Sequence, residues 1–321
     1  MTNAQRDRAV RRSGVIVLTG ATGFIGSAAL EDLVRRPGVR VRALARTPGE
    51  AREGVEWVGA DLADPASLRG VCEDATALVH LASYIGPDAE RCRTVNVEGG
   101  AALLDEAARA GVKRVIHLST AAVYGSRPHR GIEVDEVPTD PASAASRTRL
   151  ESEAPVLASG GVVLRPGLVL GAGDRWVVPA LAELLSRVPA RWDGGRALLS
   201  VVDVTELARL IGALASAADP VPGGIYHASH PVPVTTGALT QALTAHGVLP
   251  AVTRDWPWER CLEELRAHPG RVTERQFGLL ARDYCQSSEP VWRLAGVRPE
   301  TDPLAFLAAA SPWYRAHLAG A

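Results

Sequence analysis

A strand followed at once by three regularly spaced glycines constrains the fold of this chain more than any other feature. The apolar run Val15–Thr19 leads into Gly20-Ala-Thr-Gly23-Phe-Ile-Gly26, and a helical pattern continues through Val34. Such glycines let the backbone turn sharply off the strand and approach a pyrophosphate, while the N–H groups and dipole of the next helix attract its charge. The sequence therefore predicts a dinucleotide-binding βαβ unit at the beginning of the fold.

Short apolar runs alternate with longer helical patterns through the first half of the chain. The further candidate strands are Val39–Ala45, Val55–Gly59, Ala77–Leu81 and Val112–Leu118. Each is short and almost uniformly apolar, as strands are when both faces are covered. A helical pattern from Val95 to Ala110 ends at Gly111, a suitable helix C-cap. The pattern indicates repeated βαβ units and a parallel sheet.

The pattern loosens beyond Gly161, where prolines become frequent and six of the seven tryptophans occur. Core packing explains most of these tryptophans, and the rest would line an apolar ligand cleft. We expect a flexible tail over residues 1–13 and a nucleotide-binding domain over residues 14–170 plus about 199–230. A smaller substrate-binding region is expected over about 171–198 plus 231–321.

Composition excludes several classes of partner. The formal net charge is −1, so no basic field exists to neutralise the phosphates of a nucleic acid. No apolar run reaches the roughly 18 residues of a membrane span, and the four cysteines lack C-x-x-C spacing. We expect a cytoplasmic protein with reduced thiols, without a structural metal, that binds a small molecule and neither nucleic acid nor membrane.

The residue after the second candidate strand bears on the choice of cofactor. This residue is Arg46, where a ribose-binding site selective for NAD usually has Asp or Glu. A guanidinium here would pair with a 2′-phosphate and stack on adenine, which favours NADP(H), with NADPH preferred over NADH. A solvated loop arginine is the alternative at this stage.

Several ordered motifs resemble those of the extended short-chain dehydrogenase/reductase family. They are Thr19-Gly-Ala-Thr-Gly-Phe-Ile-Gly26, Asp61-Leu62, His80-Leu-Ala82, Asn96-Val-Glu-Gly99, Gly111-Val-Lys-Arg114, Ser119-Thr-Ala-Ala-Val-Tyr-Gly125, Leu164-Arg-Pro-Gly167, Val201-Val-Asp203 and Gly224-Ile-Tyr-His-Ala228. The resemblance implies an α/β fold with a doubly wound parallel (Rossmann) sheet and a smaller, mainly C-terminal substrate-binding region. It also implies a nicotinamide cofactor and catalysis by a Ser/Thr, a Tyr and a Lys.

The motifs and the resemblance together nominate binding residues. The expected cofactor contacts are Gly20, Thr22, Gly23, Phe24, Ile25, Gly26, Arg46, Asp61, Leu62, Leu81, Ala82, Ser83, Asn96, Arg149 and Pro166. The expected substrate contacts are Ser119, Ser146 and Trp176. In this assignment Arg149 binds the nicotinamide ribose or a substrate oxygen.

The sequence departs from the family at the proton-transfer residues. Thr120 retains the Ser/Thr position, four residues before Tyr124, whereas Ala145 and Arg149 stand where the family has Tyr and Lys. Lys113 is the only lysine, and no tyrosine has a lysine four residues later. Alanine donates no proton and arginine stays protonated, so neither replaces the missing acid. Tyr124 is expected to have a structural role.

Hydride transfer can survive this loss. Positioned acid catalysis is typically worth about 10²- to 10⁴-fold, and orientation of the reactants contributes several kcal/mol besides. The pattern resembles that of atypical ketoreductases that tailor aromatic polyketide antibiotics. It predicts an NADPH-dependent reductase of an aromatic ketone, with Thr120 bonded to the carbonyl and the proton supplied by water or a substrate hydroxyl. A redox-inactive NADP(H)-binding regulator and a sugar-nucleotide epimerase or dehydratase are the alternatives.

Overall fold

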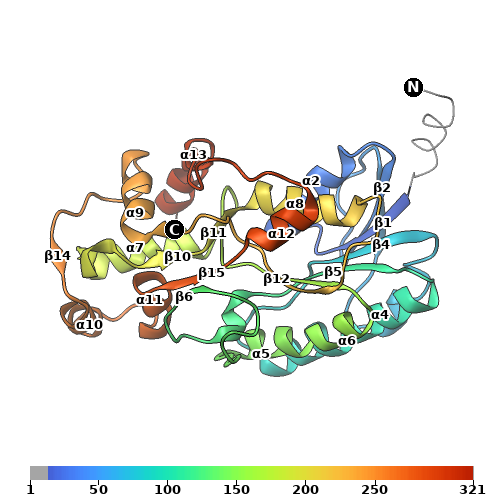
Figure 1. The fold of residues 1–321 in the computed structure, drawn as a ribbon, viewed down its shortest axis with the longest axis horizontal. Coiled ribbons are helices and arrows are strands. Elements are labelled where there is room, and N and C mark those ends of the chain that lie inside the picture. Colours follow the sequence, from blue (N-terminus) through green and yellow to red (C-terminus); the bar gives the residue numbers. More distant parts are fainter. Residues whose placement is uncertain (1–13, 321) are drawn as a thin grey trace.

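The computed structural model describes residues 14–320, so the tail expected at residues 1–13 lies outside the described residues. Figure 1 shows an elongated molecule with a large sheet and its helices at one end and a smaller, mixed region at the other. Among the described residues, no helix is both long and apolar enough to cross a membrane. The same part of the chain has no group of three or more His, Cys, Asp or Glu side chains placed to hold a metal ion.

Seven parallel strands form the main sheet, in the order β12-β7-β5-β4-β1-β2-β3. Their bounds are β1 (Gly14–Thr19), β2 (Val39–Ala45), β3 (Val55–Gly59), β4 (Ala75–His80), β5 (Arg114–Leu118), β7 (Val162–Arg165) and β12 (Gly224–His227). The chain reverses its direction across the sheet between β1 and β4, where α/β proteins of this kind bind ligands. The predicted doubly wound fold is confirmed.

Strands β1 and β4 begin one and two residues earlier than predicted, and two further boundaries shift because a side chain and a helix cap take over the terminal N–H groups. The strand expected to end at Leu81 ends at His80, since the N–H of Leu81 donates to Thr19 Oγ1 at 3.1 Å. The strand expected to begin at Val112 begins at Arg114. The N–H of Val112 instead closes the preceding helix on Ala107 O at 2.9 Å, around Gly111 at φ +77°.

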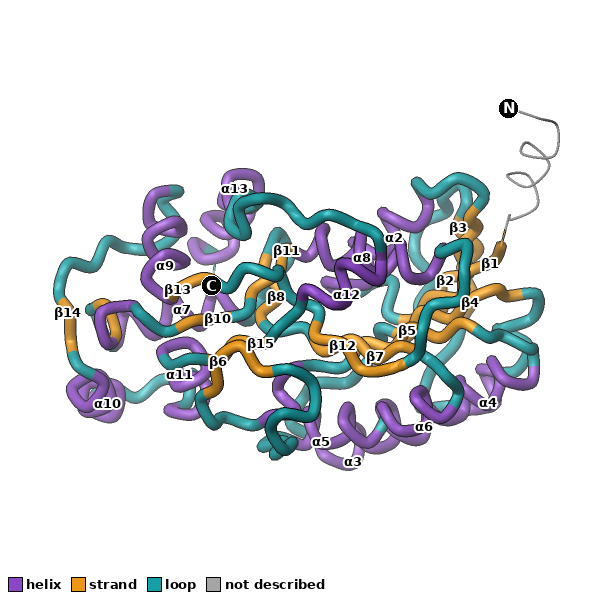
Figure 2. The backbone as a smooth tube through the Cα atoms, viewed as in Figure 1, coloured by secondary structure: helices purple, strands orange, loops and turns teal. Residues whose placement is uncertain are grey.

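Helices cover both faces of the sheet, as Figure 2 shows. One face carries α2 (Phe24–Val34), α8 (Val204–Ser216) and α12 (Glu289–Ala295), and the other carries α3 (Ala89–Cys92), α4 (Gly100–Arg109), α5 (Ala144–Glu151) and α6 (Glu153–Ala158). Separate apolar cores fill the two sides. This double coverage explains why the strand sequences are apolar without alternation.

The helix predicted from Val95 has a different beginning. It follows α3 as a π-helical segment, η2 (Arg93–Gly99), before becoming the regular helix α4. Gly99 lies so close to the backbone carbonyl of Leu62 that a Cβ there would overlap it. Short π-helical insertions are rare and often lie at functional sites, and this one carries Asn96.

The smaller region is built around its own apolar core. Its helices are α7 (Val177–Arg187), α9 (Thr236–Ala245), α10 (Trp258–Ala267), α11 (Glu274–Ala281) and α13 (Leu307–Ala319). Its strands are β6 (His129–Ile132), β8 (Leu168–Leu170), β9 (Arg191–Trp192), β10 (Leu198–Leu199), β11 (Val201–Asp203), β13 (Val234–Thr235), β14 (Asp255–Trp256) and β15 (Tyr284–Gln286). Most tryptophans of the second half are buried or half-buried, whereas Trp176 is 67% exposed.

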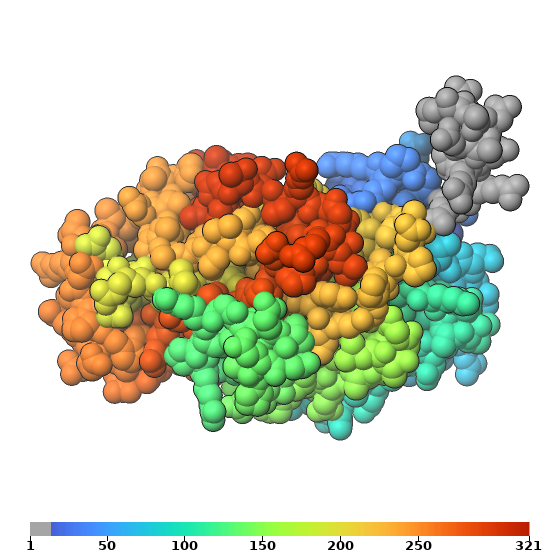
Figure 3. Space-filling view, in the orientation of Figure 1, coloured from blue at the N-terminus to red at the C-terminus, as the bar shows by residue number. Residues whose placement is uncertain are grey.

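Two segments cross the expected domain boundaries. Strand β6 belongs to the first half of the chain but pairs with β15 of the smaller region. Helix α12 comes near the end of the chain but packs against α8, and Figure 3 shows this late segment lying over the larger half of the molecule. The expected residue boundaries of the domains stay a prediction.

Candidate functional site

The glycine-rich turn has the geometry that its sequence predicts. Gly20 has φ +74°, and a Cβ there would lie 2.8 Å from the backbone N of Ala82. A Cβ on Gly26 would overlap the carbonyl oxygen of Gly20. Thr22 and Gly23 are exposed at the tip of the turn, before the N-terminus of α2. The backbone is thus open to a phosphate on its outer side and tightly packed on its inner side.

Thr19 joins this turn to the loop after β4. Its Oγ1 accepts the N–H groups of Leu81 and Ala82, both at 3.1 Å, and donates to His80 Nδ1 at 2.8 Å. Burial lowers the pKa of His80 to about 4, so the ring is a neutral acceptor at physiological pH. The structure therefore brings the predicted contacts Leu81, Ala82 and Ser83 beside Gly20.

Arg46 is exposed at the carboxyl end of β2, and within residues 14–320 no ion pair or hydrogen bond engages its side chain. Nearby arginines are paired: Arg42 with Glu56 at 2.9 Å and Arg52 with Glu31. A free cation beside the dinucleotide turn is available to an anionic group of a ligand.

Asp61 and Leu62 follow β3 at the same edge of the sheet. Asp61 is half-buried, and its carboxylate accepts the N–H of Ala63 at 3.0 Å. Leu62 is buried. These positions are compatible with the predicted border of the adenine pocket, which stays a prediction.

Asn96 makes contacts other than the expected cofactor contact. Its Oδ1 accepts the N–H of Tyr84 at 2.7 Å, and its Nδ2 donates to Tyr84 O at 2.9 Å and to Thr148 Oγ1 at 3.0 Å. Both amide hydrogens are thereby used within the protein, and the residue is buried. Asn96 thus links the loop after β4 to helix α5, and its expected cofactor contact stays a prediction.

Ala145 and Arg149 lie one turn apart on α5 and so share one face of that helix. The helix begins with a capping box in which Ser143 and Ser146 bond to each other's backbone N–H groups. It packs against η3 (Ala121–Tyr124), whose N-cap is Thr120. The expected substrate contact Ser146 is buried and its hydroxyl serves the cap, whereas Thr120 is half-buried beside Ala145's helix.

The Arg149 side chain points to the carboxyl end of β5. Its Nη2 donates to the backbone carbonyls of Leu118, at 3.2 Å, and of Ser119. Burial lowers the pKa of Arg149 to about 10, which still leaves it protonated near neutral pH. Its buried Nε has no hydrogen-bond partner within the described residues. An orphaned donor at this edge fits a polar group of a bound ligand, such as a ribose hydroxyl.

Ser119 directly follows β5, next to Thr120 in the chain. Its side chain is fully buried and donates to Glu153, which also pairs with Arg165 at 2.5 Å. The expected substrate contact at Ser119 therefore has no support in this arrangement. Pro166, an expected cofactor neighbour, is buried and its carbonyl accepts the N–H of Ala121 at 2.8 Å.

Tyr124 has a structural position, as expected. Its hydroxyl lies 2.7 Å from His227 Nε2 and accepts from Arg165 Nη1 at 2.8 Å, and burial raises its pKa. His227 Nδ1 lies 3.1 Å from Ser287 O, so the ring donates there and accepts from the phenol. Tyr124 therefore cannot replace the acid missing at position 145.

Trp176 stands at the start of α7, in a loop that lies against the cofactor turn. The carboxylate of Asp174 accepts its backbone N–H at 2.8 Å. Gly173 has φ +103°, and a Cβ there would lie 2.9 Å from the Phe24 ring. The exposed indole is thus carried by a loop that packs against the first residue of α2, and its expected contact with substrate stays a prediction.

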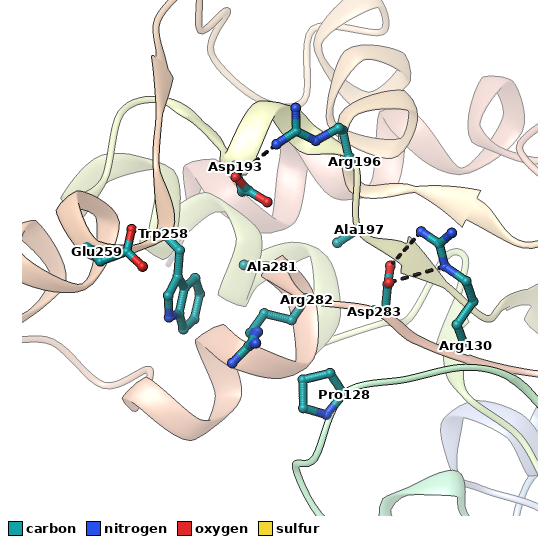
Figure 4. Close-up of a pocket in the computed structure, with 10 residues that line it drawn as sticks. All are labelled: Pro128, Arg130, Asp193, Arg196, Ala197, Trp258, Glu259, Ala281, Arg282 and Asp283. Carbon is teal, nitrogen blue, oxygen red and sulfur yellow. Dashed lines mark hydrogen bonds and ion pairs between the residues drawn. The ribbon is translucent and has the colours of Figure 1, made fainter.

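The smaller region also contains a cavity of about 490 Å³, shown in Figure 4. Three arginines line it, and two of them are paired: Arg130 with Asp283 at 3.2 Å and Arg196 with Asp193 at 3.0 Å. The third, Arg282, lies over the ring of Trp258 at 5.3 Å. Two of the three arginines that line this cavity are therefore neutralised by carboxylates of the same chain.

Sequence reasoning missed two residues that the structure places at or under the site. Glu153 is buried against Ser119 and Arg165, and Tyr84 is held by Asn96 in the loop after β4. The sequence gives little signal for either, because their partners are remote in the chain.

Comparison with known proteins agrees with this geometry. Residues 16–228 match the family model described as the NAD dependent epimerase/dehydratase family. The chain belongs to this family. It is an NAD(P)-dependent oxidoreductase of the extended short-chain dehydrogenase/reductase type, and the resemblance inferred from the motifs is confirmed at that level.

Two relatives of this epimerase/dehydratase-family chain are reductases. The 4-hydroxy-2-methyl-3-oxo-4-farnesyl-3,4-dihydroquinoline-1-oxide ketoreductase of Stigmatella aurantiaca is 34% identical over 251 residues, covering 72% of this chain and 73% of that protein. The 2-alkyl-3-oxoalkanoate reductase of Stenotrophomonas maltophilia is 28% identical over 317 residues, covering 93% and 90%. A short-chain dehydrogenase/reductase superfamily protein from Agrobacterium tumefaciens, solved with bound NAD, is similar with a TM-score of 0.73, 25% identity and coverage of 95% and 98%.

Proposed function

We propose that this protein is an NADPH-dependent ketoreductase that reduces a hydroxylated aromatic ketone without a tyrosine general acid. One observation carries the proposal: Ala145 and Arg149 share a face of α5, and α5 packs against η3, whose N-cap is Thr120, so the site keeps its positioning groups without the usual acid. The sequence resembles that of the atypical reductase of angucyclinone polyketide biosynthesis. The activities for which the two reductase relatives are named also favour reduction of a ketone.

The chain's own residues would orient the reactants. When bound, NADPH supplies the hydride. Thr120 Oγ1 accepts the N–H of Ala122 at 3.1 Å, which leaves its O–H free to donate to a carbonyl oxygen. The orphaned Nε of Arg149 would hold the nicotinamide ribose. Water or an acidic hydroxyl beside the ketone would then supply the proton, because position 145 has none.

One observation disfavours a sugar-nucleotide epimerase or dehydratase. Such reactions begin by oxidising a hydroxyl, which needs a base where Ala145 stands. Net consumption of NADPH would separate a reductase from a redox-neutral epimerase.

The assay that tests the proposal follows NADPH absorbance with a panel of hydroxylated aromatic ketones. Thr120→Ala is expected to lower kcat/KM about tenfold, the usual value of one hydrogen bond, whereas Thr120→Ser keeps most of it. Thr235→Ala is the matched control, because Thr235 caps α9 through Ala238 N at 3.0 Å in the same way but in the smaller region. Inactivity of the parent across the panel, despite NADPH binding, would contradict the ketoreductase assignment. Inactivity of the Ala145→Tyr/Arg149→Lys variant, in which the usual acid is restored, would contradict it as well.

The cofactor preference rests on Arg46. Arg46→Ala is expected to weaken NADPH binding about 20-fold and to change NADH binding little, since only NADPH has the 2′-phosphate. Arg40→Ala is the control, because Arg40 is an exposed arginine near the opposite end of the same strand. Titration of protein fluorescence with each cofactor measures both affinities. Equal losses for NADPH and NADH would refute the phosphate contact.

A further inference from the structure

One tyrosine, in the loop after β4 at the carboxyl end of the sheet, has a hydroxyl without a hydrogen-bond partner within residues 14–320. The chain has five tyrosines, all within the described residues. The hydroxyls of four are bonded: Tyr124 to His227 and Arg165, Tyr226 to Pro222, Tyr284 to Ala121 and Gly125, and Tyr314 to Gly171 and Asp174. The half-buried Tyr84 has no hydrogen bond from its hydroxyl in residues 14–320.

The backbone of Tyr84 is fixed between the cofactor turn and helix α5. Two residues earlier, Ala82 donates to Thr19 Oγ1 at 3.1 Å, next to the glycine-rich turn. The buried amide of Asn96 then holds both the N–H and the carbonyl of Tyr84, at 2.7 and 2.9 Å, and reaches Thr148 of α5 at 3.0 Å. Thr148 is the neighbour of Arg149. These contacts fix the position of Tyr84 relative to the glycine-rich turn and to helix α5, which carries Ala145 and Arg149.

The ring of Tyr84 is also held on two sides. A Cβ on Gly86 would overlap the hydroxyl and Cζ of Tyr84, so only glycine lets the ring lie where it does. The guanidinium of Arg91 lies 4.8 Å from the ring centroid, a cation–π contact. The next residue, Ile85, is 49% exposed, one of few large apolar side chains that are exposed in the described chain. A tyrosine with an unbonded hydroxyl and an exposed apolar residue are therefore adjacent in this loop.

We infer that Tyr84 is a specificity-determining residue that contacts the substrate: its hydroxyl donates to an oxygen substituent of the aromatic ketone, and Ile85 packs against the ring system. The inference rests on the proposed ketoreductase function. It fits the chemistry because a rigid aromatic residue with one free donor recognises a flat, oxygenated ligand at little cost in conformational freedom. A site built to bond a hydroxyl also rejects analogues that lack it.

The first test compares Tyr84→Phe with the parent on a hydroxylated polycyclic ketone and on its analogue without the hydroxyl. We expect kcat/KM to fall about tenfold for the hydroxylated ketone and to change less than twofold for the analogue, with NADPH affinity unchanged. Tyr226→Phe is the matched control, since Tyr226 is also half-buried and its hydroxyl bonds only to Pro222 O at 3.2 Å. An unchanged kcat/KM for both ketones, or an equal loss for both, would overturn the inference.

Gly86→Ala provides a second, geometric test. The added methyl group should displace the Tyr84 ring from this position without straining the backbone, because Gly86 has no positive φ. We expect a loss of kcat/KM similar to that of Tyr84→Phe, and no further loss when the two changes are combined, since the same hydrogen bond is removed only once. Additive losses would show that Gly86 acts independently of the hydroxyl and would count against the inference.

Failure of the proposed function can be told apart from failure of this inference. If the parent reduces no ketone of the panel, calorimetry with the same hydroxylated ketone and NADP⁺-loaded protein measures binding directly. Affinity about tenfold weaker in Tyr84→Phe would still support the contact. Equal affinity of the parent and Tyr84→Phe for the ketone would overturn the inference, whatever the catalytic activity.

Discussion

Replacing Glu153 by alanine is expected to lower the free energy of unfolding by about 3–5 kcal/mol. The side chains of Glu153 and Arg165 are only 3% and 4% exposed and lie 2.5 Å apart. Glu153 also accepts the hydroxyl of Ser119, and Arg165 donates to Tyr124. Without the carboxylate, a buried guanidinium and a buried hydroxyl both lose their partner. Urea unfolding followed by circular dichroism measures the change.

Glu151→Ala is the matched control for this prediction. Glu151, two residues before Glu153, pairs with Arg93 at 3.0 Å, but the side chains of Glu151 and Arg93 are 48% and 56% exposed. A pair so exposed is worth less than about 1 kcal/mol. The double variant Glu153→Leu/Arg165→Met should also be more stable than Glu153→Ala, because it leaves no unpaired charge. Equal stability of Glu153→Ala and Glu151→Ala would contradict the buried role of Glu153.

Replacing Gly26 by valine is expected to weaken NADPH binding at least about 100-fold, equivalent to about 3 kcal/mol. A Cβ at this position overlaps the carbonyl oxygen of Gly20, so the helix α2 must move away from the strand that precedes the turn. That movement carries the N–H groups of the turn away from the pyrophosphate. Fluorescence titration with NADPH measures the affinity.

Ser27→Val controls for the effect of valine in the first turn of α2. Ser27 is exposed and its hydroxyl bonds only to Phe24 O at 3.1 Å within the helix, so the added methyl groups meet solvent. Its NADPH affinity should stay within about threefold of the parent, while its helix stability falls slightly. Similar affinities of the two valine variants, with circular dichroism showing both to be folded, would refute the close-packing role of Gly26.

The fold could largely be predicted because its signals are local. The strand and turn at Val15 to Gly26, the apolar runs of β2 and β3, and the helix end at Gly111 each depend on a few neighbouring residues. One predicted strand end shifted because a partner from another part of the chain intervened. Leu81 lies outside its predicted strand because its N–H donates to the hydroxyl of Thr19, 62 residues earlier.

For the candidate site, the sequence allowed a prediction of the chemical groups present but not of the contacts that they make. The sequence revealed the retained Thr120 and the substitutions Ala145 and Arg149, because family spacing locates them. It could not reveal that the hydroxyl of Ser119 is used by Glu153, 34 residues later, or that Asn96 is used by Tyr84 and Thr148. Those contacts come from strands and helices that meet only in the folded chain.

The sequence alone determined that this protein has a dinucleotide-binding turn, a parallel sheet and no tyrosine at position 145, because each follows from residue type and short-range spacing. Only the tertiary structure decided which polar side chains already have hydrogen-bond partners within the protein. A hydroxyl or amide is available for binding when no other element supplies its hydrogen-bond partner, and the packing of distant elements settles that. By this criterion Ser119, Asn96 and Ser146 serve the protein itself, while Arg149 and Tyr84 keep free donors.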